Sequence, residues 1–114
     1  MIQSINVGNI YYDQEAIIKN SLKLQHLIIL SYLHQFFSSG NALFKTKPSS
    51  NEKYYLITLN KILSDLPFLN IKKRRLQELI HDLETAKILN RYSEERHCPN
   101  IYLSLNLSSV AIQT

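Results

Sequence analysis

The stretch TLNKILSDLPFLNIKKRRLQELIHDLETAKIL, residues 58–89, decides the predicted fold. Its apolar residues recur at helical spacing on either side of Pro67. Proline disfavours helical geometry at the residue before it, so a first helix should end at Leu66. A second helix follows and opens with four consecutive cations, residues 72–75. Two amphipathic helices joined by a short turn, with cations leading the second, are the pattern of a helix-turn-helix.

The first of these helices should span residues 59–66, because Thr58 is a favoured N-cap residue. In the turn that follows, Phe68 and Leu69 are expected to belong to the core. Along the helix itself, the apolar residues predicted to be buried are Leu59, Ile62, Leu63 and Leu66.

The second helix should begin at Ile71 or Lys72, with Asn70 as its N-cap, and end near Ala86. Its two faces differ in polarity, which is the mark of a helix that packs on a core with one side. The inner face is predicted to be Leu76, Leu79, Ile80 and Leu83, and the outer face Lys73, Arg74, Gln77, Glu78 and His81.

Two β-prone runs follow the second helix, at residues 88–92 and 101–107. Apolar and polar residues alternate in the second run, as expected for a half-buried strand. The polar residues 93–100 would connect the two strands. A polar hairpin directly after a helix-turn-helix is the wing of a winged helix-turn-helix. Residues 108–114 are expected to form a frayed tail or the start of a linker.

The residues before this unit predict three supporting elements. Residues 1–12 should form an extended arm that packs onto the body, with a turn at Val7-Gly8-Asn9. Asp13 should cap a short helix that ends near Lys19. Residues 42–58 should form a hairpin with a polar tip. A central helix is predicted over residues 22–37, with a buried stripe made of Leu24, Leu27, Ile28, Leu30, Ser31, Leu33 and Phe37.

The predicted fold class is therefore α+β. The 114 residues fit one winged helix-turn-helix domain with three to four helices, a small antiparallel sheet and a C-terminal wing hairpin. Hydrophobic residues make up 45% of the chain, enough for a real core. A single cysteine, Cys98, excludes an internal disulfide and fits a reducing compartment. With neither a signal peptide nor a long apolar run, a cytoplasmic location away from membranes is expected.

The cationic start of the second helix carries the main functional signal. The chain has a formal net charge of +4, and Lys72 to Arg75 is its only run of four cations. Cations at a helix N-terminus are unfavourable for the helix dipole, so the run suggests a polyanionic ligand such as double-stranded DNA. The alternative is an ordinary solvated helix end. Glu78 on the same face argues against DNA, unless it accepts from a cytosine amino group or pairs with Arg74 or Arg75.

The predicted wing adds a second group of candidates. Arg91, Arg96 and His97 could touch backbone phosphate or the minor groove, or could be ordinary surface charge beside Glu94 and Glu95. The complete set of candidate DNA-binding residues is Lys72, Lys73, Arg74, Arg75, Gln77, His81, Arg91 and Arg96.

The sequence carries no catalytic signature. The four histidines are scattered and form no HExxH motif, so no metal is expected. No serine has the flanking glycines of a nucleophile elbow, and the chain lacks a glycine-rich phosphate loop. We therefore expect neither an enzyme nor a cofactor.

The chain resembles a known family. The segment YYLITLNKILSDLPFLNIKKRRLQELIHDLETAKILNRY, residues 54–92, is similar to the winged-helix domain at the N-terminus of phage and plasmid replication-initiation proteins. The turn DLPFL, residues 65–69, is the most specific match. Upstream, AIIKNSLKLQHLIILSYL, residues 16–33, is similar to the helices that precede that unit. The resemblance covers roughly residues 10–106.

The resemblance implies a DNA-facing surface that includes Lys73, Arg74 and Gln77, and a wing over residues 91–100. This chain departs from the family pattern at two positions. Lys87 stands where the family usually has glycine before the wing. A second departure is Glu78, at a position where a basic residue is common.

Two functions of different classes follow. The first is a non-catalytic DNA-binding protein of a mobile element, phage or plasmid, acting in DNA replication or transcription regulation. The second is a protein-binding module, such as a phage-encoded inhibitor of a host defence complex, because fold alone does not fix function. Either function is compatible with a homodimer formed through the helix at residues 24–37 or through the N-terminal arm.

Overall fold

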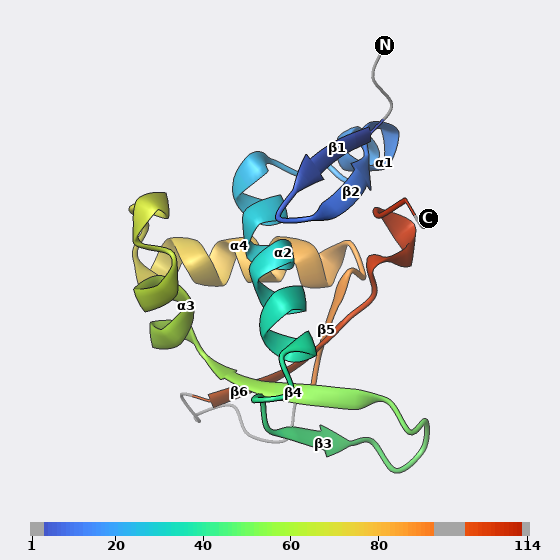
Figure 1. Ribbon diagram of the computed structural model, residues 1–114, viewed down its shortest axis with the longest axis vertical. Helices are drawn as coiled ribbons and strands as arrows, with labels where there is room; N and C mark the ends of the chain where they lie inside the picture. The colour runs from blue at the N-terminus through green and yellow to red at the C-terminus, as the bar shows by residue number, and fades with distance from the viewer. Residues whose placement is uncertain (1–3, 93–99, 113–114) are drawn as a thin grey trace.

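Four α-helices and two antiparallel sheets are found in residues 4–92 and 100–112, which are the residues that the computed structural model describes (Figure 1). Helix α2, Leu24–Ser38, crosses the middle of the molecule and passes over α4, Lys73–Thr85. A four-stranded sheet closes one end, and a small hairpin with α1 covers the other. The α+β class is confirmed.

The N-terminal arm is a paired hairpin rather than a single extended segment. Strand β1, Ser4–Val7, pairs antiparallel with β2, Ile10–Asp13. Between them, Gly8 and Asn9 both have positive φ, +59° and +68°, the requirement of a two-residue type I′ turn. The hairpin packs on the body as expected, because the Ser31 hydroxyl on α2 donates to the Val7 carbonyl at 2.7 Å.

Helix α1, Gln14–Lys19, begins where the sequence predicted. The Asp13 carboxylate accepts from the Glu15 backbone N–H at 3.3 Å and caps the helix. The next helix, α2, buries most of the predicted stripe, but Leu24 is 60% exposed. Leu24 is the first residue of α2, and the buried residues of this helix begin only at His26.

The four-stranded sheet has the order β3-β4-β6-β5. Its strands are β3 (Phe44–Thr46), β4 (Lys53–Thr58), β5 (Leu89–Arg91) and β6 (Asn100–Leu105). The predicted hairpins at residues 42–58 and 88–107 are both confirmed as antiparallel pairs.

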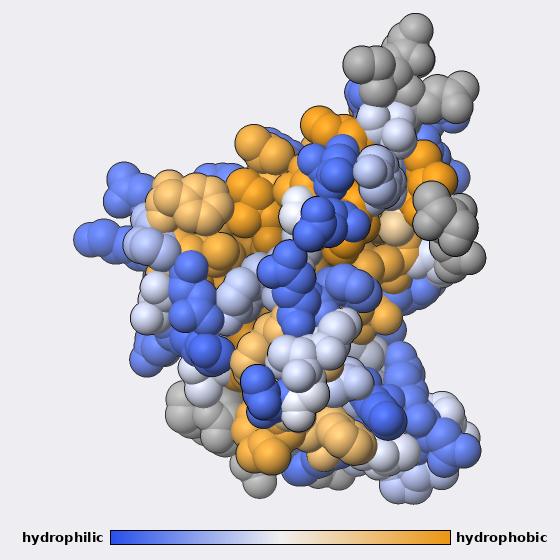
Figure 2. Space-filling view, viewed as in Figure 1, coloured by the Kyte–Doolittle hydropathy of each residue, from blue (hydrophilic) through white to orange (hydrophobic). Residues whose placement is uncertain are grey.

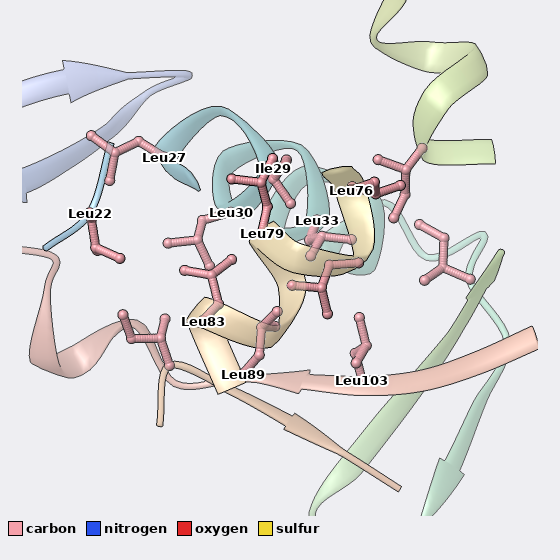
Figure 3. Close-up of a cluster of buried hydrophobic side chains, with 14 of the residues drawn as sticks. Leu22, Leu27, Ile29, Leu30, Leu33, Leu76, Leu79, Leu83, Leu89 and Leu103 are labelled. Carbon is pink, nitrogen blue, oxygen red and sulfur yellow. The ribbon is translucent and has the colours of Figure 1, made fainter. Parts of the chain in front are cut away.

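Helix α3, Leu59–Asp65, and the 3-10 turn η1, Pro67–Leu69, lead into α4. Thr58 caps α3 as predicted, since its Oγ1 accepts from the Lys61 backbone N–H at 3.1 Å. The predicted inner face of α4 is confirmed, and in Figure 3 its leucines face those of α2 across the core above β6. The four side chains of this face, all fully buried, are Leu76, Leu79, Ile80 and Leu83.

Two predictions for the turn before α4 are wrong. Phe68 is 67% exposed rather than part of the core. Asn70 does not cap α4, because its φ of +51° places it in the left-handed region, where its N–H closes η1 onto the Pro67 carbonyl at 3.1 Å. Asparagine tolerates this conformation better than most residues. The extended residue Lys72 is the actual N-cap, and its side chain makes no capping hydrogen bond.

The end of α4 is a Schellman motif, and its left-handed position is filled by Lys87 with φ +62°. The Ile88 N–H donates to the Leu83 carbonyl and the Lys87 N–H donates to the Glu84 carbonyl, each at 3.0 Å. Ile88 and Leu83 are both fully buried, which completes the apolar contact of the motif. The chain therefore reverses toward β5 in the geometry that glycine would provide.

Residues 107–112 are packed rather than frayed, which corrects the expected tail. A short 3-10 turn, η2, spans Leu107–Ser109, and the next residue, Val110, is buried. The Asp13 N–H donates to the Val110 carbonyl at 2.8 Å, and the Ile112 N–H donates to the Tyr11 carbonyl at 2.7 Å. Propensity alone could not show this, because the partner strand is about a hundred residues away in sequence.

No helix in the described parts of the chain is long and apolar enough to cross a membrane.

Candidate nucleic-acid interface

The N-cap and the first turn of α4 form an exposed cationic tip, defined here as Lys72, Lys73 and Arg74. None of these three side chains has a hydrogen bond or an ion pair with the described residues. The first turn contains no acidic residue. The first N–H groups of any helix lack partners within that helix. The cationic side chains and these backbone donors therefore lie together at the N-terminus of α4.

Arg75 is different from its three neighbours because it is held in place. Its guanidinium donates to the Gln25 side-chain carbonyl and to the Glu78 carboxylate, each at 3.4 Å. The first contact ties the start of α4 to the first turn of α2. The second shows that Glu78 pairs with Arg75 rather than with Arg74. Arg75 therefore positions the tip and neutralises part of the Glu78 charge.

Gln77 and His81 extend the exposed surface along α4. They lie one and two turns beyond Lys73 on the outer face, and both are exposed. His81 also borders a pocket of about 520 Å³ between α4 and the turn that joins α1 to α2. The structure thus brings five of the eight predicted residues onto one surface, with Arg75 at its edge.

The acidic residues of α4 lie beyond its first turn, and each has a cationic or hydrogen-bonding partner. Glu78 contacts Arg75, and Glu84 contacts Arg91 of β5 at 2.8 Å. Asp82 lies 3.0 Å from the Nε2 of His26. These contacts reduce the negative potential near the tip, so Glu78 is a weaker argument against an anionic ligand than its position in the sequence suggested.

His26 is a buried residue of this site that the sequence interpretation missed. Its Nδ1 accepts from the Lys23 backbone N–H at 2.8 Å, so its proton is on Nε2 and is donated to Asp82. His26 therefore joins the start of α2 to the middle of α4. Its position at N3, where a glutamate or glutamine often completes a capping box, was the available signal.

In the strand that follows α4, the predicted candidate Arg91 has a partner within the protein. The side chain of Arg91 is 41% exposed and forms the ion pair with Glu84, which anchors β5 to α4. Arg91 is thus engaged within the protein. Arg96 and His97, the other candidates in this region, lie outside the described residues.

The other end of the helical pair is fixed by Asp65, the first residue of the DLPFL turn. Its carboxylate accepts from the Tyr32 hydroxyl at 2.5 Å and from the Lys61 ammonium at 3.1 Å. The Tyr32 hydrogen bond, followed by Lys61, lowers the pKa of Asp65 below its ordinary value. The Tyr32 contact holds the end of α3 against α2, and so helps to set where η1 and the start of α4 lie.

The candidate site consists of exposed cationic and polar side chains on α4. Among the described residues, no group of three or more His, Cys, Asp or Glu side chains could hold a metal ion. Comparisons of the chain with protein-family models, with curated proteins and with solved structures find no match. The function is therefore inferred from the residues and their arrangement.

Proposed function

We propose that this protein is a non-catalytic winged helix-turn-helix that binds double-stranded DNA with the cationic tip of α4. Helices α3 and α4 would be the helix-turn-helix, and the β5–β6 hairpin would be the wing. The resemblance to replication-initiation proteins of phages and plasmids supports a role in replication or transcription on a mobile element.

One observation carries the proposal: the tip residues Lys72, Lys73 and Arg74 have no partner among the described residues, and they lie at the end of the helix where cations are least favourable. Packing does not require these charges, because the core face of α4 is supplied by its leucines and Ile80. Phosphate neutralisation would repay their electrostatic cost. Gln77 and His81, farther along the same face, can reach base edges as donors and acceptors.

The test is a fluorescence-anisotropy titration of a labelled duplex at two or more salt concentrations. Each cation that contacts a phosphate contributes about −0.9 to the slope of log K against log salt concentration. A variant with Lys72, Lys73 and Arg74 changed to alanine should therefore bind more weakly and have a slope shallower by about 3. A slope equal to that of wild type would show that the tip makes no phosphate contact.

The matched control removes the same charge from the far side of the sheet. Lys45, Lys47 and Lys53 lie on the β3–β4 hairpin, which is well separated from the start of α4 in Figure 1. Changing these three to alanine should reduce affinity only through net charge, with a much smaller change in slope. If wild type shows no binding at low salt but captures a stoichiometric protein partner, the protein-binding function would replace this one.

A further inference from the structure

An uncharged groove lies between α2, the β1–β2 turn and η1. Its volume is about 250 Å³, and its lining includes Val7, Ile28, Tyr32, Gln35, Leu66 and Phe68. Figure 2 shows hydrophobic surface gathered over η1 and the first half of α2, in the upper left of the view. The groove thus lies within an apolar region of the surface, beside the cationic tip and distinct from it.

Two large side chains stand out from this surface. Phe68 is 67% exposed and Leu24 is 60% exposed. Leu24 precedes Ile28 by one turn of α2, so it extends the apolar wall of the groove toward the start of that helix. Clustered exposed side chains of this size, next to a hollow with the same apolar character, mark an interaction site more often than scattered ones do.

The charges at the rim indicate what kind of partner fits. None of the described residues that line the groove carries a formal charge. At the rim, Lys61 and Asp65 pair with each other at 3.1 Å and leave no net charge to attract an acidic or basic partner. A neutral face of this kind adds no charge repulsion of its own when two copies of the chain, each with net charge +4, meet. The same rim pair can also exchange partners across a two-fold axis, Lys61 of one copy facing Asp65 of the other.

We propose that this groove is the interface of a homodimer, in which Phe68 of each copy inserts into the groove of the other. A two-fold interface brings one surface patch against itself, so it needs a projection and a matching hollow on the same patch. This surface has both. The sequence offered two candidate dimer interfaces, the N-terminal arm and the helix at residues 24–37. The groove is lined by residues of both, from the β1–β2 hairpin and from α2.

The interface would lie next to the site of the proposed function. Phe68 is only four residues before Lys72, so the two cationic tips of the dimer, one on each side of its two-fold axis, would flank the interface. Two tips related by that axis suit a DNA target with two symmetric half-sites. The dimer itself does not depend on DNA binding and can be tested without DNA.

Sedimentation equilibrium of the full chain, from roughly 1 µM to roughly 100 µM and without DNA, tests the interface. Wild type should show a monomer–dimer equilibrium. Phe68→Asp should raise the dimer dissociation constant about tenfold or more, because a carboxylate would be buried in the apolar groove of the partner. Leu43→Asp is the matched control, since Leu43 is 71% exposed and lies outside the groove. It should dimerise as wild type does.

Circular dichroism of both variants checks that the fold is retained, and Leu24→Asp provides a second disruption of the same surface if Phe68→Asp fails to fold. A monomeric wild type over the whole range would overturn the proposal, and would leave the groove to a partner of another kind. An unchanged dissociation constant in Phe68→Asp or Leu24→Asp, or an equal loss in Leu43→Asp, would also overturn it. None of these outcomes depends on whether the cationic tip binds DNA.

Discussion

The Nε2 of His26 lies 3.0 Å from the Asp82 carboxylate, and this contact joins the start of α2 to the exposed side of α4. His26 is 2% exposed, and its second nitrogen accepts from the Lys23 backbone. The imidazole ring of His26 therefore provides hydrogen bonds to two polar groups, the Lys23 backbone N–H and the Asp82 carboxylate. The orientation of α4, and with it the direction of the cationic tip, depends on a residue that would not itself touch a ligand.

Replacing His26 with alanine should lower the free energy of unfolding by about 2–3 kcal/mol, because it leaves the Lys23 N–H without its acceptor and opens a space in the core. Urea denaturation measures the loss. His81→Ala is the control, because His81 is exposed on the same helix and should change stability by less than about 0.5 kcal/mol. Equal effects of the two changes would contradict a structural role for His26.

Gly8 should tolerate alanine less well than Gly40. Both glycines have positive φ, +59° and +82°, so alanine at either position carries a backbone cost of about 1 kcal/mol. A β-carbon at Gly8 would also lie 2.8 Å from the Cβ of Ser31, whereas one at Gly40 would meet nothing within 4 Å. Thermal unfolding should therefore show a larger loss for Gly8→Ala. Similar losses would mean that the hairpin shifts away from α2 without cost.

Lys87→Gly should stabilise the protein by about 1 kcal/mol. Lys87 is in the left-handed conformation at the end of α4, where a side chain adds strain that glycine avoids. Denaturant titration measures the gain. The reference change is Lys19→Gly at the end of α1, a helical residue where glycine should destabilise instead. A loss of stability in Lys87→Gly would show that the lysine side chain has a stabilising contact that outweighs the strain.

Lys73→Glu should change stability and DNA binding in opposite directions. A carboxylate in the first turn of α4 interacts favourably with the helix dipole, so the free energy of unfolding should rise by about 0.3–1 kcal/mol. DNA affinity should fall, because a negative charge would face the phosphates. Chemical denaturation and the anisotropy titration give the two values. A variant that lost both stability and affinity would indicate that Lys73 has a structural function.

The Tyr32–Asp65 contact should contribute to the free energy of unfolding at neutral pH, and this contribution should be lost in acid. Tyr32 holds the pKa of Asp65 below its ordinary value of 3.8, so the unfolded chain takes up the proton first as the pH falls. The stabilisation is therefore present above about pH 4 and is lost as the pH drops through the pKa of the folded state. Between about pH 7 and about pH 3, wild type should lose more stability than Tyr32→Phe. An NMR titration should also find a higher Asp65 pKa in that variant.

The sequence predicted best where periodicity and local chemistry agree. The buried face of α4 was correct at all four positions because apolar spacing fixes which side of a helix meets the core. The caps at Asp13 and Thr58 were also correct, since each side chain needs only a backbone N–H two or three residues away. The cationic tip was likewise visible as a run of charge.

The errors lie where distant parts of the chain decide the outcome. The sequence predicts Asn70 as the N-cap of α4, but the turn has a left-handed residue at this position instead. The hydrophobicity of Phe68 predicts a place in the core, yet its side chain is 67% exposed. The function of His26 depends on Asp82, which is 56 residues away, so the local pattern could not show it. Packing of Val110 against β2 has the same cause.

The pairing of Tyr12 with Ala111 has a consequence for how the chain folds. This contact closes almost the full length of the described chain, whereas the contacts among α2, α3 and α4 and within the sheet close shorter loops. Loop closure costs more entropy as the loop lengthens, and non-local contacts slow folding. We expect the helical and sheet layers to assemble first. The segments around Tyr12 and Ala111, near the two ends of the described chain, would then join last, and their separation would be the first step of unfolding.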